Sequence, residues 1–468
     1  MKVLIGRQII VTEPSPELVA WAEETLTIPN PDYAKKKRMG FWLGRTPPEL
    51  CIYERDGNDL VLPFGLIRDV LPMVQGAEMQ TRFNPKPANV AYGAEIPLYD
   101  YQIEAVEAMM KAKFGILQSR AGSGKTQMGI AIVSRWGRRA LWLTHTHDLL
   151  RQSKERAEQY MDPSLMGTIT AGKVDIGSGI TFATVQTMNN IDLDLYRYHW
   201  DVIIVDECHR VAGTPTSMTQ FQHVLNSLAA PHKYGLSATV HRADGMIKAT
   251  CSLLGNVAYT VPDAAVADKV MQVRINPVET QYDISRKCLN TDGTINYTAM
   301  IEDMAGNEDR NQLIAFQVIC EEAKQHSCLV LSSRIFQLEA IRNWLPDELM
   351  HRSALITGKM TTKKGMVQRA EAIEQMRTRE KTILFATYNL CKEGLDIPIL
   401  DRLFLASPQK DYAVITQSLG RIARTAPGKQ EPVCFDFVDN KVGYLARAYK
   451  TRCTTYRKNG CVMPPKKK

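Results

Sequence analysis

The sequence predicts an α/β protein with two tandem parallel-sheet domains and a small N-terminal α+β domain. Two series of short apolar runs carry this prediction, since each run has the length of a buried strand and a polar helical stretch separates it from the next. The first series is FGILQ, ALWLT, ITFAT, DVIIVDE and YGLSAT, and the second is CLVLSS, SALIT, TILFATY, RLFLAS and VCFDFV. Alternation of this kind is typical of a parallel sheet with helices on both faces.

The N-terminal 90 residues have a different pattern, rich in proline and glycine. The segment SPELVAWAEETL is helix-like, and LCIYERDGNDLVLPF is strand-like with a tight turn at Asp56-Gly57. Pro85 and Pro87 indicate a linker after these elements. We therefore expect a separate small domain before the first sheet.

The composition is that of an ordinary globular protein, with 44% apolar and 23% charged residues. No run of about 18 apolar residues is present, so we expect no membrane span. The ten cysteines are scattered singly, without a C-x-x-C pair. This predicts a reduced, intracellular protein without a cysteine zinc site.

Positive charge is concentrated at the C-terminus. The chain has 58 Lys+Arg against 50 Asp+Glu, a formal charge of +8, and residues 441–468 contain nine basic residues and no acidic one. Subtracting these nine leaves 49 basic against 50 acidic residues in the rest of the chain. Such a segment can follow a nucleic-acid backbone, or it can be a solubilising tail.

The run SRAGSGKT, residues 119–126, ends like a phosphate-binding loop, G-x-x-x-x-G-K-[ST], with Ser119 in place of the first glycine. It follows the predicted strand FGILQ and precedes a helical stretch, so backbone N–H groups and a helix N-terminus can face a phosphate. Its side chains divide the remaining tasks. Gly122 and Gly124 allow the backbone to come close to the phosphates. Lys125 supplies a charge for the β- and γ-phosphates, and Thr126 supplies a hydroxyl for Mg²⁺.

A second element supports a nucleotide site. DVIIVDECH is an apolar strand that ends in Asp206-Glu207, and a carboxylate at the carboxyl end of a sheet strand can hold Mg²⁺ beside a phosphate. Asp206 would hold the metal through water, and Glu207 would polarise the attacking water. The alternative is an acidic first turn of a helix, which is common. Two independent elements in this order favour the nucleotide site.

D-E-C-H together with S-x-x-G-x-G-K-T resembles the motifs of superfamily 2 helicases, which tolerate Ala or Ser at the first loop position. Further motifs of that family match in order from residue 98 to about 440. They are YDYQ, LTHTHDLLRQ, FATVQTM, LSAT, LVLSSR, ATYNLCKEGLDIP and QSLGRIAR. The resemblance implies two RecA-like domains, with ATP and Mg²⁺ as cofactors.

The family pattern gives expected domain boundaries. A small DNA-binding domain would occupy residues 1–88, the ATP-binding RecA-like domain 95–262, a connecting segment 263–310, the second RecA-like domain 311–445 and a basic C-terminal segment 446–468. Within the connecting segment, KVMQVRINPVE is extended and apolar. The helix-like stretch YTAMIEDMAGNEDRNQLIAF begins in this segment and extends beyond residue 310.

QSLGRIAR places Gln417, Arg421 and Arg424 at spacings of four and three residues, on one face of a predicted helix. By the resemblance, these catalytic side chains point at the ATP held by the first domain, and an arginine there stabilises charge on the transferring phosphoryl group. Arg421 and Arg424 are the candidates, and the family pattern assigns this role to Arg424. The alternative is a basic surface helix.

The resemblance implies further roles, residue by residue. Gln102 reads the adenine edge, and Gly394 and Asp396 contact the nucleotide sugar or the adjoining helix. The nucleotide-binding set is Gln102, Ser119, Gly122, Ser123, Gly124, Lys125, Thr126, Gly394 and Asp396. Hydrolysis is coupled to domain movement through His209, Ser237 and Thr239. The phosphates of one strand are contacted at Thr144, Thr184 and Thr387, without reading of sequence.

The subgroup that the chain resembles is XPB-like, which includes phage recombination helicases of the UvsW type. That group carries R-E-D after the LSAT motif, whereas this chain has Arg242-Ala243-Asp244, so only Arg242 is carried over as a nucleic-acid contact. The segment NPDYAKKKRMGFW joins charges for phosphates to flat rings for bases, at Lys35, Lys36, Lys37, Arg38, Phe41 and Trp42. The alternative is a solvated loop in which Trp42 packs on a small core.

The sequence therefore predicts a DNA helicase or translocase that remodels branched or forked DNA, by fork regression, junction migration and loop dissociation. We expect it in the cytoplasm of a bacterium or a phage-infected host, as a protein that can act as a monomer and that does not contact a membrane. An RNA helicase shares the same motor, and the motor subunit of a restriction complex is a further alternative. No nuclease carboxylate cluster is evident, so such a complex would need a partner that cuts. A non-catalytic clamp is disfavoured by the intact ATP motifs.

Overall fold

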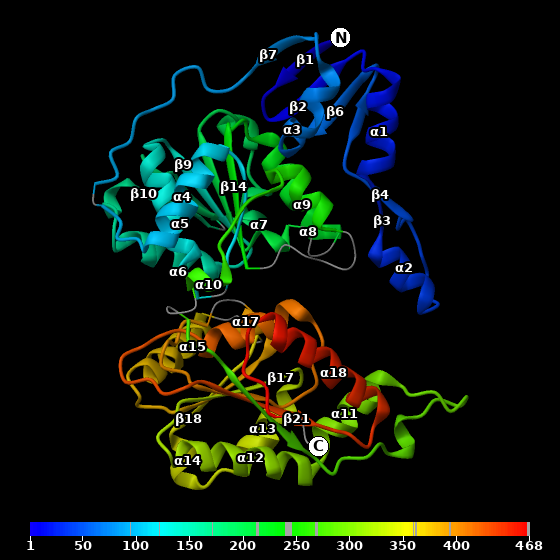
Figure 1. Ribbon diagram of the computed structural model, residues 1–468, viewed down its shortest axis with the longest axis vertical. Coiled ribbons are helices and arrows are strands. Elements are labelled where there is room, and N and C mark those ends of the chain that lie inside the picture. Colours follow the sequence, from blue (N-terminus) through cyan, green and yellow to red (C-terminus); the bar gives the residue numbers. More distant parts are fainter. Residues whose placement is uncertain are drawn as a thin grey trace. The chain divides into compact units, whose positions relative to one another are not determined.

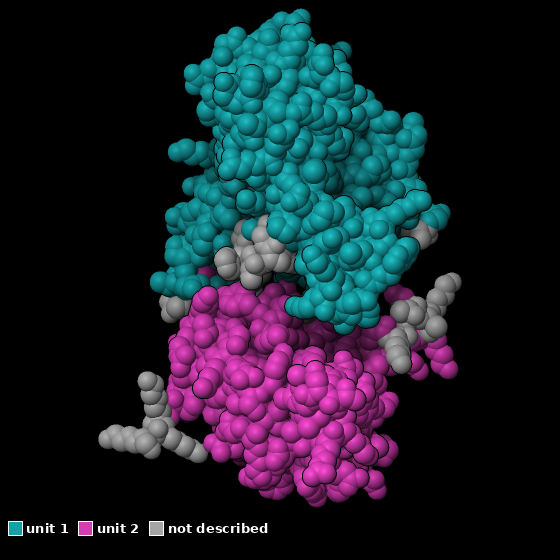
Figure 2. Space-filling view, turned by 90° about the vertical axis from the view of Figure 1, so that its right-hand side faces the viewer, with its two compact units in different colours: residues 1–120, 124–265 teal, residues 121–123, 266–468 magenta. Residues whose placement is uncertain are grey.

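The computed structural model describes residues 1–93, 95–120, 122–170, 172–211, 215–238, 246–266, 270–358, 360, 363–392 and 395–465. Contacts divide the chain into two compact units, shown in Figure 2. The first unit holds residues 1–120 and 124–265, and the second holds residues 121–123 and 266–468. Among the described residues, no helix combines the length and apolar character that crossing a bilayer requires.

An eight-stranded sheet is the framework of the first unit (Figure 1). Its order is β11-β10-β12-β9-β13-β14-β8-β15, and every pair is parallel except β10 with β11. The strands are β8 (Gly115–Gln118), β9 (Ala140–Thr144), β10 (Met166–Thr170), β11 (Lys173–Asp175), β12 (Ile180–Thr184), β13 (Val202–Asp206), β14 (His232–Ser237) and β15 (Val257–Thr260). The five predicted strands of the first series are confirmed.

Helices cover both faces of this sheet, which is why its central strands are buried along their whole length. One face carries α4 (Asp100–Ala112), α5 (Lys125–Trp136) and α6 (His147–Glu158), packed side by side. The other carries α7 (Val185–Met188), α8 (Pro215–Ser227) and α9 (Ile247–Leu254). A short helix, α10 (Asp263–Val266), follows β15.

The N-terminal part of the first unit has a five-stranded sheet of its own, in the order β5-β6-β2-β1-β7. The strands are β1 (Lys2–Ile5), β2 (Gln8–Thr12), β5 (Glu54–Asp56), β6 (Asp59–Pro63) and β7 (Glu78–Thr81), with helices α1 (Pro16–Leu26) and α3 (Ile67–Val70). Gly57 has a φ of 57° in the turn between β5 and β6, as the Asp-Gly pair predicts. The predicted α+β character is confirmed.

This N-terminal sheet shares its hydrophobic core with the larger sheet. Phe114, Met218 and Ala249 of the larger sheet's layer belong to the same buried cluster as the side chains of β1, β2 and β6. Gly65 approaches the end of α9 so closely that an added Cβ would lie 2.6 Å from the carbonyl oxygen of Cys251. Close packing of backbone against backbone therefore fixes the N-terminal sheet to the first RecA-like layer.

A buried lysine also joins the two sheets of the first unit. The Nζ of Lys233 on β14 donates to the carbonyl oxygens of Leu225, at 2.7 Å, and Arg7, at 3.3 Å. It lies 5.1 Å from the centroid of the Phe64 ring. Burial lowers the pKa of Lys233 to about 7.

Residues 27–51 form an arm that stands off the N-terminal sheet (Figure 1). Its base is a two-stranded sheet of β3 (Thr27–Pro29) and β4 (Glu49–Cys51), and between them lies α2 (Pro31–Arg38). Asn30 caps α2 by accepting hydrogen bonds from the backbone N–H groups of Asp32 and Tyr33. Every residue from 31 to 51 is at least partly exposed, so the arm has no core of its own.

The second unit contains a six-stranded, fully parallel sheet in the order β16-β21-β20-β17-β19-β18. The strands are β16 (Arg274–Glu279), β17 (Cys328–Ser332), β18 (Ser353–Ile356), β19 (Ile383–Thr387), β20 (Arg402–Leu405) and β21 (Val433–Val438). The helices are α11 (Tyr297–Gly306), α12 (Glu308–Glu322), α13 (Ile335–Asn343), α14 (Asp347–His351), α15 (Lys363–Arg377), α16 (Tyr388–Lys392), α17 (Tyr412–Ile422) and α18 (Gly443–Lys458). The second predicted series is confirmed.

Two segments of the second unit refine the sequence prediction. The helix-like stretch after residue 296 is two helices, because Asn307 interrupts it and caps α12 through a hydrogen bond from the backbone N–H of Arg310. The basic C-terminal segment forms α18, whose buried Arg452 pairs with Asp436 of β21 at 2.8 Å. A basic composition alone does not show that one face of this helix is buried.

We expect the unfolding free energy of the chain to rise with pH through Lys233. The folded state binds fewer protons at this site than the unfolded state between about pH 7 and the ordinary lysine value of 10.5, so stability increases with pH across this window, by up to about 1.4 kcal/mol per pH unit. In urea unfolding at pH 7 and 9.5, Lys233→Met should remove this increase. Equal pH dependence in the variant and the parent would contradict the prediction.

Candidate ATP site

The phosphate loop follows β8 and leads into α5. Gly122 and Gly124 have φ angles of 88° and 79°, a left-handed conformation that favours glycine. Lys125 is buried at the first position of α5, and its Nζ donates to the carbonyl oxygens of Ser119, at 3.3 Å, and Arg120, at 3.4 Å. The loop thus folds around its own lysine at the N-terminus of a twelve-residue helix, an arrangement suited to phosphate.

Gln102 is buried against this loop. An added Cβ at Gly124 would approach the flexible Nε2 end of Gln102, so the two residues are in close contact. The Oε1 of Gln102 accepts a hydrogen bond from the backbone N–H of Tyr99, at 3.0 Å, at the start of α4. The structure therefore places Gln102 in the first turn of α4, beside the phosphate loop. Its expected role toward adenine stays a prediction.

Two carboxylates lie at the carboxyl end of β13, the strand that β14 separates from β8 in the sheet. Asp206 is the last residue of β13, and it accepts hydrogen bonds from the backbone N–H of Glu207, at 2.9 Å, and the hydroxyl of Ser153, at 3.3 Å. Glu207 has a φ of 48°, an uncommon conformation for a residue other than glycine. This sharp turn sends the two carboxylates in different directions from one strand end.

Charge and burial set the proton affinity of Asp206. Burial, and then the negative charge of Glu207, raise the pKa of its carboxyl group above the ordinary value of 3.8. The positive charge of Lys125 opposes this rise, as do the two hydrogen bonds that the carboxylate accepts. A buried carboxylate beside a lysine fits a divalent cation held together with a phosphate, and Thr126, which follows Lys125 on α5, stays the predicted hydroxyl ligand.

His209 joins the second carboxylate to strand β14. Its Nδ1 lies 3.2 Å from Oε2 of Glu207 and 3.1 Å from Oγ of Ser237. The carbonyl oxygen of Ser237 in turn accepts a hydrogen bond from the backbone N–H of Ser119, at 3.0 Å. Short contacts therefore connect Glu207, which is predicted to polarise water, through His209 to Ser237. The backbone of Ser237 in turn contacts the start of the phosphate loop.

The three threonines expected to touch a nucleic-acid strand lie at carboxyl ends of strands. Thr144 and Thr184 are opposite each other in the ladder of β9 and β12, and Thr387 ends β19 in the second unit. The hydroxyl of Thr144 donates to the carbonyl oxygen of Thr146, at 3.1 Å, and that of Thr184 lies 2.8 Å from the hydroxyl of Thr187. Both are buried, so these side chains hold their own loops.

The arginine motif of the second unit differs in shape from the prediction. Helix α17 ends at Ile422, so Gln417 and Arg421 are helical but Arg424 lies beyond the helix, paired with Val270 in an isolated bridge. The expectation that all three side chains share one helical face was wrong for Arg424.

Both arginines contact the ATYNLCKEGLDIP motif. Arg421 donates to the carbonyl oxygens of Cys391, at 3.1 Å, and Leu395, at 3.2 Å. Arg424 forms an ion pair with Asp396. Arg377 of α15 also donates to the carbonyl oxygen of Asp396, at 2.8 Å. Asp396 therefore connects the arginine motif to an adjoining helix, one of its two expected roles, and Gln417 is buried on α17.

Three predicted site residues lie outside the described residues, namely Thr239, Arg242 and Gly394. Two contacts escaped the sequence prediction. Ser153 on α6 orients Asp206, and Arg377 on α15 holds Asp396. Ser153 directly follows the LTHTHDLLRQ motif and Arg377 lies outside the named motifs, so only their place in the fold reveals these contacts.

The predicted nucleic-acid residues of the N-terminal part lie on the arm. Lys35, Lys37 and Arg38 are exposed on or at the end of α2, and Lys36 donates to the hydroxyl of Thr46, at 2.7 Å. Trp42 is 88% exposed, which contradicts the alternative that it packs on a small core. Its ring lies over Gly44, where an added Cβ would be 3.0 Å away.

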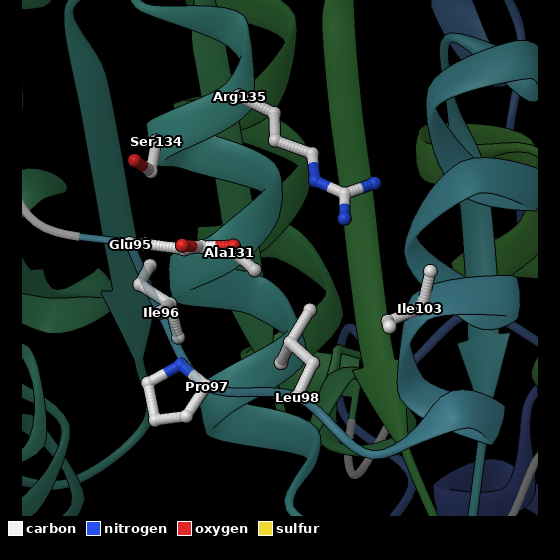
Figure 3. A pocket seen from close by; sticks show the side chains of 8 residues that line it. All are labelled: Glu95, Ile96, Pro97, Leu98, Ile103, Ala131, Ser134 and Arg135. Atoms are coloured by element: carbon white, nitrogen blue, oxygen red, sulfur yellow. The ribbon is translucent and has the colours of Figure 1, made fainter.

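A cleft of about 480 Å³ lies along α5 (Figure 3). It is lined by Glu95, Ile96, Pro97, Leu98, Ile103, Ala131, Ser134 and Arg135. Figure 3 shows the extended segment 95–98 beside the later turns of α5, with Ile103 contributed by α4. Lys125 begins the same helix and does not line this cleft, so the cleft is separate from the phosphate loop.

Comparisons with known families define the class of the protein. The family described as "Type III restriction enzyme, res subunit" matches residues 95–242, and the family described as "Helicase conserved C-terminal domain" matches residues 309–426. Together with the ordered motifs and the two parallel sheets, these matches place the chain in superfamily 2 of the helicases, which use ATP.

Individual relatives have modest identity. "Putative ATP-dependent RNA helicase L396" of Acanthamoeba polyphaga mimivirus is 25% identical over 75% of this chain and 65% of its own length, so the chain spans less than two thirds of that relative. "DNA 3'-5' translocase XPB2" of Sulfurisphaera tokodaii is 26% identical over 70% of this chain and 79% of its own. "Probable helicase D10" of Escherichia phage T5 is 23% identical over 74% and 72%.

Solved structures show the same fold. S. cerevisiae Dbp5 bound to RNA and ADP BeF3 has a TM-score of 0.53 at 17% identity, over 86% of this chain and 94% of its own. The type ISP restriction-modification enzyme LlaBIII bound to DNA has a TM-score of 0.54 at 16% identity, over 77% of this chain and 30% of its own. T4 UvsW aligns over 99% of both chains at 18% identity, with a lower TM-score of 0.41.

Lys125→Ala should lower ATP turnover by roughly 10²–10³-fold or more, because it removes a preorganised charge from the transferring phosphoryl group. The measurement is steady-state phosphate release with saturating nucleic acid. Lys111→Ala is the matched control, since Lys111 is exposed on α4. Turnover retained in Lys125→Ala would contradict the assignment of the loop.

Asp206→Asn should abolish turnover and yet stabilise the nucleotide-free protein near pH 7.5. Since the folded state raises the pKa of Asp206, stability is lost as the pH rises from about 4 toward the folded pKa, and an amide avoids this loss. Thermal unfolding in EDTA should show a higher Tm for the variant, by roughly 2–4 °C per kcal/mol. The exposed-site control Asp175→Asn should leave the Tm unchanged, and a lower Tm for Asp206→Asn would refute the prediction.

Proposed function

We propose that the chain is an ATP-dependent DNA translocase that remodels branched DNA. Its expected reactions are fork regression, Holliday junction branch migration and unwinding, in recombination, repair or replication. The observation that carries the proposal is the arm of residues 27–51, which presents aromatic and basic side chains to solvent on the same unit as Lys125 and Asp206.

The arm suits a nucleic-acid end or branch better than a protein core. Trp42 is 88% and Phe41 58% exposed, and Met39 beside them is also exposed. Water contact with such large apolar groups is costly, and flat rings recover this cost when they stack on bases. The four consecutive cations of α2, residues 35–38, provide charge for the flanking phosphates.

The motor supplies the movement in this proposal. Thr126 and Asp206 would hold Mg²⁺ beside the phosphates of ATP, and bound Mg-ATP supplies the electrophilic γ-phosphoryl group. Glu207 would polarise the attacking water, while His209 and Ser237 would transmit the change to β14. Their contacts of 3.2 and 3.1 Å provide a direct route for that transmission.

The arginine motif would complete the site from the second unit. Arg424 is proposed as the residue that stabilises the transferring charge, and its ion pair with Asp396 keeps the guanidinium ordered before ATP is engaged. Arg421, bonded to two carbonyl oxygens, would instead hold the loop that carries Asp396. The loops that begin at Thr144, Thr184 and Thr387 would contact strand phosphates through their backbone N–H groups.

The domain boundaries expected from the sequence are part of the proposal, with residues 1–88 as the DNA-binding part and residues 95–262 and 311–445 as the two halves of the motor. A monomer suffices for this mechanism, because one chain carries both halves. DNA is preferred as the substrate because one relative is named a DNA 3'-5' translocase.

Two alternatives have support of their own. One relative is named an RNA helicase, and Dbp5 shares the fold while bound to RNA. The family matched by residues 95–242 is described as a restriction-enzyme subunit, and LlaBIII shares the fold. Both alternatives retain the same ATP site, so the substrate decides between them.

The deciding measurement is the ATPase rate with no nucleic acid, single-stranded DNA, linear duplex, a four-way junction and single-stranded RNA at one salt concentration. The greatest stimulation by the junction supports branched-DNA remodelling. Stimulation by RNA and not by DNA would leave the motor assignment intact and overturn the proposed substrate.

Trp42→Ala should weaken binding to a four-way junction by roughly 5- to 150-fold, the range expected for loss of one base–aromatic stack. Fluorescence anisotropy with a labelled junction measures this effect. Trp344→Ala is the matched control, because Trp344 is a partly exposed tryptophan on the second unit. Equal junction affinity in the two variants would exclude a stacking role for Trp42.

A further inference from the structure

A second surface with aromatic and basic side chains lies on the second unit. It is formed by four segments that are distant in sequence, and we name it the tyrosine patch. Its members are Tyr297 of α11, Arg334 after β17, Lys410 after β20, and Tyr444 and Arg447 of α18. Arg334 comes from the LVLSSR motif, but none of the other four belongs to a motif that the resemblance covers.

Direct contacts join three members of the patch, namely Tyr297, Tyr444 and Lys410. The centroids of Tyr297 and Tyr444 are 5.3 Å apart, with their planes tilted by 57°. The Nζ of Lys410 lies 3.2 Å from the hydroxyl of Tyr444 and 5.6 Å from its ring centroid. Partial burial and the Coulombic effect of Tyr444 raise the pKa of Tyr297, and the positive charges of Lys410 and Arg334 oppose this rise.

The patch lies at the carboxyl edge of the second sheet. Ser332, which ends β17, is opposite Thr387 in the ladder of β17 and β19, and Arg334 follows two residues later. Lys410 follows the next strand along, β20. In open α/β sheets this edge is where ligands bind, so the patch extends the line of strand ends that begins at Thr387.

Helix α18 continues the positive charge away from the rings. Arg447 lies one turn after Tyr444, and Lys450 and Arg457 follow at spacings of three and seven residues, all exposed. The opposite face of α18 is fixed by the buried Arg452, so the exposed stripe has a defined direction. Residues 441–468 contain no acidic side chain that could neutralise it.

We infer that the tyrosine patch binds single-stranded DNA, with a base stacked on Tyr297 and flanking phosphates on Lys410 and Arg447. This inference rests on the proposed function and adds a strand-binding site on the second unit. The ring of Tyr297 is 48% exposed and Tyr444 supports it from one side, so a flat partner can reach it. Charge complementarity selects a polyanion, and the paired rings select an unpaired strand, whose bases are accessible.

A surface that is merely solvated would also contain lysine and arginine, but it would not require two tyrosines at its centre. Tyr297 occupies the first position of α11, where its ring is not needed to bury the helix. Met300 and Ile301 carry the buried contacts of α11 instead. Tyr297 contacts Tyr444, which itself packs on that cluster, and 48% of Tyr297 stays exposed, so its ring is available to a flat partner.

The test uses the full chain without nucleotide and a labelled oligo-dT of 20 nucleotides. Tyr297→Ala should weaken binding by roughly 5- to 150-fold in fluorescence anisotropy, and Tyr297→Trp should restore it, because a larger ring still stacks. Lys410→Ala and Arg447→Ala should each reduce the slope of log affinity against log salt by about 0.7, the value for one phosphate contact to a single strand.

Phe316→Ala and Lys324→Ala are the matched controls. Phe316 is 58% exposed on α12, and Lys324 lies before the amino end of β17, on the opposite edge of the sheet. Binding of Tyr297→Ala with the affinity of Phe316→Ala would overturn the inference while leaving the proposed function intact. A parent protein that binds neither oligo-dT nor a junction would overturn both, and a loss confined to oligo-U would reassign the patch to RNA.

Discussion

A carboxylate buried at the carboxyl end of β13 is the constraint on which the first unit depends. Burial of Asp206 is unfavourable unless opposite charge and hydrogen-bond donors surround it. The chain supplies these from three directions, as Lys125 of the phosphate loop, Ser153 of α6 and the backbone N–H of Glu207. Meeting this requirement brings strand, loop and helix together at one edge of the sheet.

The same requirement explains the unusual backbone that follows. The left-handed turn at Glu207 separates the two carboxylates and brings the second against His209. His209 then reaches Ser237 at the end of β14, two strands in from the sheet's last strand. A change of charge at the phosphate loop can therefore act on β14 through Glu207 and His209, whose side chains lie 3.2 Å apart.

The N-terminal sheet is connected to this same strand from the other end. Lys233 begins the buried part of β14 and bonds to the carbonyl oxygen of Arg7, while Gly65 packs against α9. The arm with Trp42 thus stands on a part of the molecule that shares a hydrophobic core with the ATP-binding sheet. Such a shared core lets strain in one layer be felt in the other, because packed interiors deform little.

The sequence by itself determined the two strand series at the centre of the sheets, their order along the chain, and the positions of the glycine-bearing loop before α5 and of Asp206-Glu207 at the end of β13. These features depend on local patterns, namely apolar runs, glycines in a loop and carboxylates after a strand, which are visible at short range. The arginine motif was only partly predicted, because α17 ends at Ile422 and Arg424 instead pairs with Val270 in a bridge.

The tertiary structure alone decided which distant side chains meet. Ser153 orients Asp206, Arg377 holds Asp396, and Tyr297 lies against Tyr444, although 53, 19 and 147 positions separate these partners along the chain. It also decided that Trp42 is exposed and that one face of α18 is buried. Periodicity shows which face of an element is apolar, but only the packed chain determines what that face contacts.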